Sequence, residues 1–384
     1  MAIRVNPKLI DELAVYGAED VQNCYHCGNC SAVCPFSKEP YIFPRRPMRN
    51  LQMGLEDKLK GSLEPWLCYY CGECTEECPR GAEPGETMMS LRRWLTAKYD
   101  FSGISRLFYR SGKIELLAVI GAALLTALGF VLWAVWQGGS IYSYDGPNAF
   151  LPAESIHIFD WVLAGVLLVL LLTNCTRMWW FTMGRDKTLN ASVGLYLKKL
   201  YALPLHFITQ KRYAKCEKKR PWAVHLVLML SYLIMLVLIM FFLVEMSAST
   251  IDWRLHVFGY IATVGLLGTT IFALRGRIKK SEPLYAHSHE TDWIFLILLI
   301  VVAFTGILQH ILHRAGLDAA ANVVYIIHLM GVVPMLALEV PFSKWSHLAY
   351  RPLGMYFSLV RAEAKRRASE EAAQPVMVTQ RVVG

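Results

Sequence analysis

Apolar residues are concentrated in six long runs, all of them after residue 114. Each run has the ~20 residues that a helix needs to cross the hydrocarbon core of a bilayer. The predicted membrane-spanning helices cover residues 115–136, 157–179, 222–244, 255–274, 292–313 and 321–343. The first 110 residues contain no such run and show only short helical patterns, for example over residues 47–59 and 88–98. The pattern predicts an all-α protein in which a small N-terminal domain is joined to six transmembrane helices.

The charges in the loops predict how these helices are oriented. Lys and Arg are frequent between the second and third spans and between the fourth and fifth, whereas residues 137–156 contain neither. Loops rich in Lys and Arg stay on the cytoplasmic side. We therefore expect a multi-pass protein of the cell inner membrane with both termini in the cytoplasm. Membrane topology and lipid contact also account for the net charge of +9, so we expect no nucleic-acid partner.

Composition agrees with two domains of different character. Hydrophobic residues make up 55% of the 384 residues and charged residues 18%, while eight of the ten cysteines lie in the first 80 positions. A chain this apolar is typical of a membrane-embedded protein. No apolar signal segment opens the chain, so we expect the cysteines in the reducing cytoplasm. The predicted units are residues 1–110, a ferredoxin domain; 111–360, the membrane domain; and 361–384, a charged cytoplasmic tail that is solvated or disordered.

The cysteines of the N-terminal domain repeat one spacing, Cys-x2-Cys-x2-Cys-x3-Cys-Pro, twice. In such motifs the first three thiolates hold one iron–sulfur cubane, and the fourth cysteine, before the proline, ligates the other cluster. The spacing therefore predicts two [4Fe-4S] clusters with crossed ligands. The first cluster takes Cys24, Cys27, Cys30 and Cys78; the second takes Cys68, Cys71, Cys74 and Cys34.

Two other uses of these cysteines are less consistent with the spacing. Zinc sites need four ligands each but give no reason for a repeated fourth Cys-Pro. Disulfides would require an oxidising compartment, for which the sequence offers no signal. Two iron–sulfur clusters in a helical ferredoxin domain remain the favoured prediction.

Histidines at membrane depth predict a second kind of redox centre. An ionisable residue inside a span is costly and marks a functional site by default, and neutral imidazole is an axial ligand of haem b. No Cys-x-x-Cys-His attachment motif for covalent haem occurs. His225 and His347 lie near the inner face and are the expected ligands of one haem; His328 and His310 lie in the outer half and are the expected ligands of a second, with His256 as a rival to His310. The membrane domain is thus predicted to be a six-helix cytochrome b bundle.

The order of these features resembles a known family. A helical domain with the twin motif, joined in one chain to six spans, resembles the C subunit of the quinone-interacting membrane-bound oxidoreductase complex of sulfate reducers. That family looks like a fusion of the C and E subunits of membrane-bound heterodisulfide reductase. The run from His328 to His347 is similar to the last helix of the respiratory nitrate reductase gamma subunit, where two histidines ligate two haems. In its third span this relative has two haem histidines, whereas this chain has His225 and, about where the other would fall, Met235. The second ligand of the outer haem therefore cannot be carried over.

The resemblance implies a function. Menaquinol from the quinone pool would be oxidised in the membrane, and electrons would pass through haems b and the two clusters to flavin- and cluster-containing A and B subunits. The implied acceptor is adenylylsulfate reductase. The chain would act as the electron-transfer subunit of a quinone-dependent oxidoreductase complex.

Two other functions stay open. A heterodisulfide-reductase-type subunit would need a thiol site, yet no adjacent Cys-Cys pair occurs, and Cys175 and Cys216 are isolated in the sequence. A partner would have to supply that site. A ferredoxin domain on a simple membrane anchor would contain no haem, and the placement of the histidines is the main observation against it.

Overall fold

The computed structural model describes residues 4–136, 138, 152–247, 253–280 and 282–373. Within these ranges the regular structure is helical; the described residues form no β-strand, and Lys38 and Tyr41 make an isolated bridge. Six helices of this part of the chain are long and apolar enough to cross a membrane. The all-α class and the six predicted spans are thus confirmed.

Short helices and turns build the N-terminal domain. They are α1 (Leu9–Ala14), α2 (Asn29–Ala32), α3 (Arg45–Gln52), α4 (Glu56–Lys60), α5 (Glu64–Leu67), α6 (Glu73–Glu76), α7 (Pro84–Tyr99) and α8 (Ile104–Arg110). The helix expected over residues 88–98 is confirmed within α7. The pattern over residues 47–59 forms two helices, α3 and α4, because the chain turns at Gly54. This glycine has a φ of +65°, and a Cβ there would lie 2.4 Å from the backbone oxygen of Asn6.

The membrane domain consists of long helices that cross the bundle from end to end. The spans are α9 (Gly112–Trp136), α10 (Ala153–Trp179) with a π-helical turn to Gly184, α13 (Arg220–Ser247), α14 (Trp253–Lys279), α16 (Glu290–Arg314), and α17 (Asp318–Pro334) with its continuation to Phe342. Neighbours pack in the order α10, α13, α14, α16, α17 and α9. Their outward Leu, Val and Ile side chains, such as Leu125 and Val264, are exposed, as expected for a surface that lipid covers.

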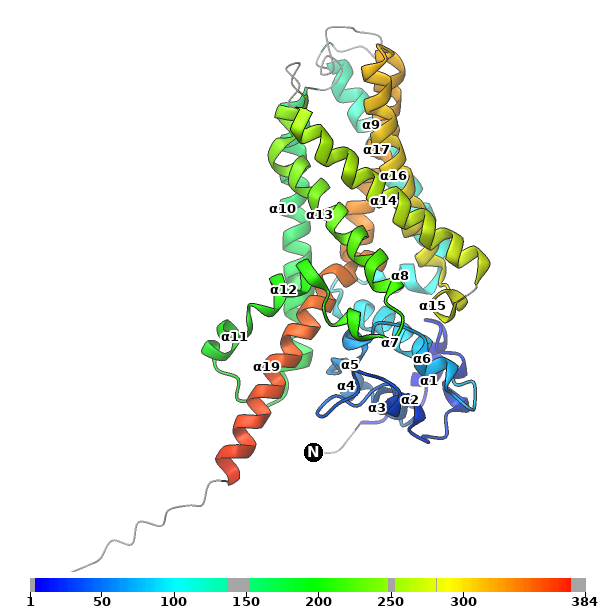
Figure 1. Cartoon of the computed structure of the whole chain (residues 1–384), viewed down its shortest axis with the longest axis vertical. Coiled ribbons are helices and arrows are strands. Elements are labelled where there is room, and N and C mark those ends of the chain that lie inside the picture. Colours follow the sequence, from blue (N-terminus) through cyan, green and yellow to red (C-terminus); the bar gives the residue numbers. More distant parts are fainter. Residues whose placement is uncertain (1–3, 137, 139–151, 248–252, 281, 374–384) are drawn as a thin grey trace, which may run out of the picture.

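Figure 1 shows α1 to α7 gathered below one end of this bundle. The connection between α10 and α13 lies at the same end and contains α11 (Val193–Lys199), α12 (Ala202–Thr209) and a short 3-10 turn, Tyr213–Lys215. The segment between α14 and α16 adds α15 (Pro283–Ala286).

The end of the sixth span differs from the continuous helix expected over residues 321–343. After α17 the chain makes a π-helical turn (Met335–Glu339), the short α18 (Val340–Phe342) and a 3-10 turn (Lys344–Ser346). Pro334 and Pro341 lack the amide hydrogen that a regular helix needs. His347 therefore begins a new helix, α19 (His347–Ala373), rather than ending the span.

Helix α19 includes the first part of the predicted charged tail. Residues 361–384 were expected to be solvated or disordered. Residues 361–373 are not disordered, because they continue α19 away from the bundle (Figure 1), but residues 365–372 are exposed, as a solvated segment would be. Glu363 lies 3.2 Å from Arg367, and Arg366 pairs with Glu370; such pairs one turn apart stabilise an exposed helix. Residues 374–384 lie outside the described part of the chain.

One hydrophobic core connects the two halves of the molecule. Trp66 of α5, Tyr99 of α7 and Tyr350 of α19 are almost completely buried, and their ring centroids lie 5.2–6.3 Å apart. Arg361 of α19 donates hydrogen bonds to the carbonyl oxygens of Gly61 and Thr182. The N-terminal domain is therefore packed firmly against one end of the bundle of membrane helices.

Candidate functional site

The first predicted set of thiols lines one cavity. Cys24, Cys27, Cys30 and Cys78 surround it, together with apolar neighbours such as Met48. Burial, together with the nearby Cys24 sulfur, raises the pKa of Cys30 to about 11. Thiolates packed this closely need a positively charged centre to offset their repulsion. The donor set fits an iron–sulfur cluster.

The second predicted set lines a second cavity. It contains Cys34, Cys68, Cys71 and Cys74, and the rings of aromatic neighbours such as Tyr69 close it. Burial again raises the pKa of the Cys74 thiol, and neighbouring cysteines add to the shift. Each cavity is thus lined by three cysteines of one motif and the fourth cysteine of the other, which is the grouping that the spacing predicts. All ten cysteines of the chain are free thiols.

Both motifs fold in the same way because they share their turn residues. The chain has positive φ at His26 and at Tyr70, and again at Gly28 and Gly72, with φ of 94° and 92°. Glycine adopts this conformation without steric cost. Each glycine precedes a short helix, α2 or α6, that carries the third cysteine of its motif.

His225 of α13 and His347 of α19 lie close together at the end of the bundle that packs against the N-terminal domain. Their ring centroids are 6.5 Å apart. A metal ion bound between two imidazole nitrogens at about 2 Å each would separate the ring centres by roughly 6 Å. The spacing therefore fits the axial ligands of a haem.

Hydrogen bonds orient both rings as a metal site requires. His225 donates from Nδ1 to the Gln210 side-chain oxygen at 2.9 Å, and His347 donates from Nδ1 to the Lys344 carbonyl oxygen at 2.6 Å. Within the described residues, the Nε2 atom of neither ring has a hydrogen-bond partner. Ligating histidines characteristically use their second nitrogen in this way. Burial lowers the pKa of His347 to about 3, so its ring is neutral.

The outer histidines are arranged differently from the expected pair. His310 packs against His256 and Tyr260, with centroid distances of 4.9 and 5.4 Å. His328 lies instead against α16, where its Nδ1 is 3.0 Å from the Thr305 hydroxyl and its ring touches the position of Gly306. The structure therefore brings His310 together with its rival, His256. Their centroid distance of 4.9 Å is shorter than the roughly 6 Å expected for two ligands on opposite sides of one metal ion, so these two rings do not have the spacing of axial haem ligands.

The segment from Gln210 to Cys216 connects the two kinds of site. Tyr213 stacks on Tyr69 of the second cavity, at 4.8 Å and 22°, and its ring also meets the His225 ring edge-on at 6.1 Å. Gln210, as described above, orients His225. Cys216, which looked isolated in the sequence, lies beside Cys71 in space. Sequence reasoning missed these three residues. Tyr213 and Cys216 meet Tyr69 and Cys71, which are far away in the sequence, and no local pattern marks such contacts. Gln210 is 15 positions from His225, at a spacing that belongs to no ligand motif.

A buried carboxylate joins the domains beside this route. Asp292, at the start of α16, contacts Lys344 at 2.6 Å, Arg277 at 3.6 Å and Arg93 of α7 at 3.7 Å. Arg93 also pairs with Glu86 at 2.7 Å. Three cations around one buried carboxylate hold the N-terminal domain, α14 and the residue that orients His347 in one network.

Comparisons with known proteins support the iron–sulfur part of this site. Residues 20–82 match the family of 4Fe-4S dicluster domains. The chain is 37% identical over 71 residues to the iron-sulfur C subunit of the CoB–CoM heterodisulfide reductase of Methanopyrus kandleri. That alignment covers 16% of this chain and 37% of the relative, so the chain spans well under two thirds of the relative's length. No solved structure matches the chain. The protein thus combines an N-terminal 4Fe-4S ferredoxin-like domain with six apolar helices, as a multi-pass membrane protein for redox electron transfer.

Proposed function

We propose that this chain is the membrane electron-transfer subunit of a complex that oxidises menaquinol and delivers the electrons to cytoplasmic flavin- and cluster-containing subunits. The observation that carries the proposal is the His225–His347 pair, whose spacing and hydrogen bonds suit haem ligation. An anchor without redox function has no use for two buried histidines that share this spacing and this pattern of hydrogen bonds. Haem b and the two [4Fe-4S] clusters supply the one-electron chemistry, and the chain supplies their positions and surroundings.

The contacts between the domains support an order for these centres. The cavity of Cys68, Cys71 and Cys74 lies on the membrane side, because the Cys68 carbonyl oxygen accepts a 3.0 Å hydrogen bond from Arg351 of α19. Tyr213 fills the space between this cavity and His225. The second cluster is therefore the one that receives electrons from the membrane domain.

The first cavity is suited to the partner side. Cys27 is exposed. Tyr25 beside it is 69% exposed, with the Arg80 guanidinium 4.2 Å above its ring. An exposed aromatic ring under an arginine is a common type of interface anchor. We propose that the soluble subunits dock here, with adenylylsulfate reductase as the final acceptor and both chain termini in the cytoplasm.

The second haem remains part of the proposal without an assigned pair of ligands. His328 is the remaining candidate in the outer half, since its Nδ1 is bound by Thr305 and its ring lies on the inner surface of α17 against α16. His310 and His256 contact each other.

A heterodisulfide-reductase-type subunit is the second candidate function. It is favoured by the match to an iron-sulfur subunit of that enzyme. In this case the same membrane route would end at a disulfide substrate bound by a partner, because this chain has no adjacent cysteine pair. The two candidates share the quinol side and differ only in the acceptor.

Anaerobic addition of a reduced menaquinone analogue tests the shared part. We expect the native protein to show the electron paramagnetic resonance signals of reduced clusters, and H347A to lose this reaction while dithionite still reduces its clusters. H287A is the matched control, since His287 also lies near the inner face but pairs with Glu83 at the surface. Quinol-driven cluster reduction at the native rate in H347A would contradict the proposal.

A further inference from the structure

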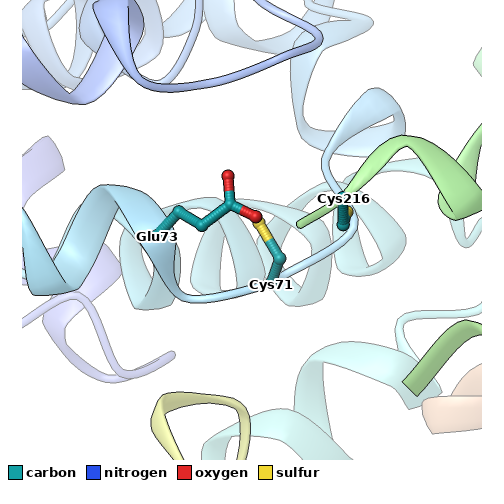
Figure 2. Close-up of side chains that lie close together, drawn as sticks. All are labelled: Cys71, Glu73 and Cys216. Carbon is teal, nitrogen blue, oxygen red and sulfur yellow. The ribbon is translucent and has the colours of Figure 1, made fainter. Parts of the chain in front are cut away.

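A ninth cysteine lies beside the second cluster cavity. The Cys216 and Cys71 sulfur atoms and a Glu73 carboxylate oxygen all lie within 4.8 Å of one another (Figure 2). Cys71 lines the second cluster cavity, whereas Cys216 is not part of the lining of that cavity. Cys216 is completely buried. Its thiol can therefore reach the outer side of a cluster ligand without being a ligand itself.

Hydrogen bonds on both sides fix Cys216 in this place. Its carbonyl oxygen accepts a 2.7 Å hydrogen bond from the Lys219 ammonium, and its amide donates to the Tyr213 carbonyl oxygen at 3.1 Å. The next amide, that of Glu217, donates to the Glu73 carboxylate at 3.1 Å. The membrane-domain segment thus docks on the turn that follows Cys71 and keeps the two sulfur atoms together.

The surroundings of the first cluster cavity differ. Cys27, the counterpart of Cys71, is exposed. Asn29 replaces Glu73, and its amide donates to the Glu77 carbonyl oxygen at 2.7 Å. Among the described residues, no thiol outside the two motifs approaches Cys27. The two motifs share one spacing, but the second also receives an extra thiol and a carboxylate.

We propose that the Cys216 thiol donates a hydrogen bond to the Cys71 sulfur when that sulfur binds iron, and that this bond raises the reduction potential of the second cluster. Reduction adds negative charge that spreads onto the ligand sulfurs, so a donor stabilises the reduced state. The Glu73 carboxylate acts in the opposite direction, because a nearby negative charge disfavours reduction. Cys216 is a positioning residue here, and the inference rests on the proposed assignment of Cys71 to a [4Fe-4S] cluster.

Redox titration of the purified full-length protein, followed by electron paramagnetic resonance, tests the inference. In C216A the equilibrium constant for reducing the second cluster should fall severalfold to tenfold, where tenfold is about 59 mV for a one-electron couple. C216S keeps a donor and should return the potential toward the native value. E73Q should shift it upward. The first cluster should keep its potential in all three variants.

C175A is the matched control, since Cys175 is the other cysteine outside the motifs and lies in α10. A C216A potential equal to the native one would overturn the inference, as would equal shifts of both clusters. Iron content separates this failure from that of the proposed function. About eight irons per chain with unchanged potentials reject only the role of Cys216, whereas the absence of a second cluster signal from the native protein rejects the cluster assignment and this inference with it.

Discussion

Single residues decide which thiols line the same cavity. Cys34 ends the first motif but lines the second cavity. Cys78 ends the second motif but lines the first cavity. The positive-φ glycines Gly28 and Gly72 turn each chain so that the third thiol enters the cavity and the fourth leaves it. Each cavity is therefore lined by cysteines of both motifs, and under the proposed assignment neither cluster would form from one motif alone.

Replacing the fourth cysteine of either motif tests whether the cluster ligands are crossed between the motifs. We expect C34A to lose the same cluster signal as C68A, and C78A to lose the same signal as C24A, with about four irons remaining in each. Iron analysis and electron paramagnetic resonance of the reduced proteins provide the measurement. If C34A instead matches C24A, the ligands are not crossed.

The grouping of the motif cysteines could be predicted from the sequence because the rule behind it is local: spacing and a following proline. The surroundings of the clusters could not. Cys216, Gln210 and Tyr213 come from a segment that reaches the ferredoxin domain only after two membrane crossings. His310 also shows the limit, since its position along a helix does not determine which ring it packs against.

At the scale of elements, Asp292 links α16 to α7, α14 and the turn before α19. It is 4% exposed and contacts Arg93, Arg277 and Lys344. Removing one partner of a buried ion pair leaves the others uncompensated, which typically costs about 3–5 kcal/mol. The network therefore holds the ferredoxin domain against the membrane domain.

D292N should lower the melting temperature clearly and weaken the haem spectrum, because Lys344 carries the carbonyl oxygen that orients His347. D57N is the control: Asp57 pairs with Arg185 at 3.3 Å on the surface, where a pair contributes at most about 1 kcal/mol. Thermal unfolding followed by circular dichroism measures both. A melting curve for D292N as mild as that for D57N would mean that the network does not join the elements.

The existence of the six spans could be predicted because length and hydropathy alone determine it. The irregular end of the sixth span could not, although Pro334 and Pro341 hinted at it. A window of apolar residues looks the same whether the helix continues or makes a π-helical turn. The continuation of α19 past residue 360 was also not predicted, because composition does not show how side chains pack or pair. Val360 and Ala364 are buried, and ion pairs such as Glu363–Arg367 stabilise the exposed part of the helix.

At the scale of the whole molecule, one end of the helix bundle carries all eight motif cysteines. The ferredoxin domain, the connection with α11 and α12, and α19 lie at this end (Figure 1). Trp66, Tyr99 and Tyr350 come from distant parts of the chain and form the shared core. Sequence patterns predicted two domains, but this common core makes them one packed unit.

Reporter fusions test which side of the membrane this end faces. A green fluorescent protein fused after residue 384 should fluoresce, and alkaline phosphatase inserted between α9 and α10 should be active, because residues 137–156 contain no Lys or Arg. The same phosphatase placed between α11 and α12 should be inactive. The opposite activities at the two phosphatase sites would reverse the proposed orientation.

The reduced-minus-oxidised absorbance spectrum, with haem, iron and sulfide quantified, tests the central claim most directly. The native protein should contain haem b together with about eight non-haem irons per chain. H225A and H347A should each lose the inner haem and keep the iron, whereas H256A, whose ring contacts His310, should retain the inner haem. Eight irons without haem in the native protein, or full haem content in both H225A and H347A, would contradict the account and leave a ferredoxin domain on a membrane anchor.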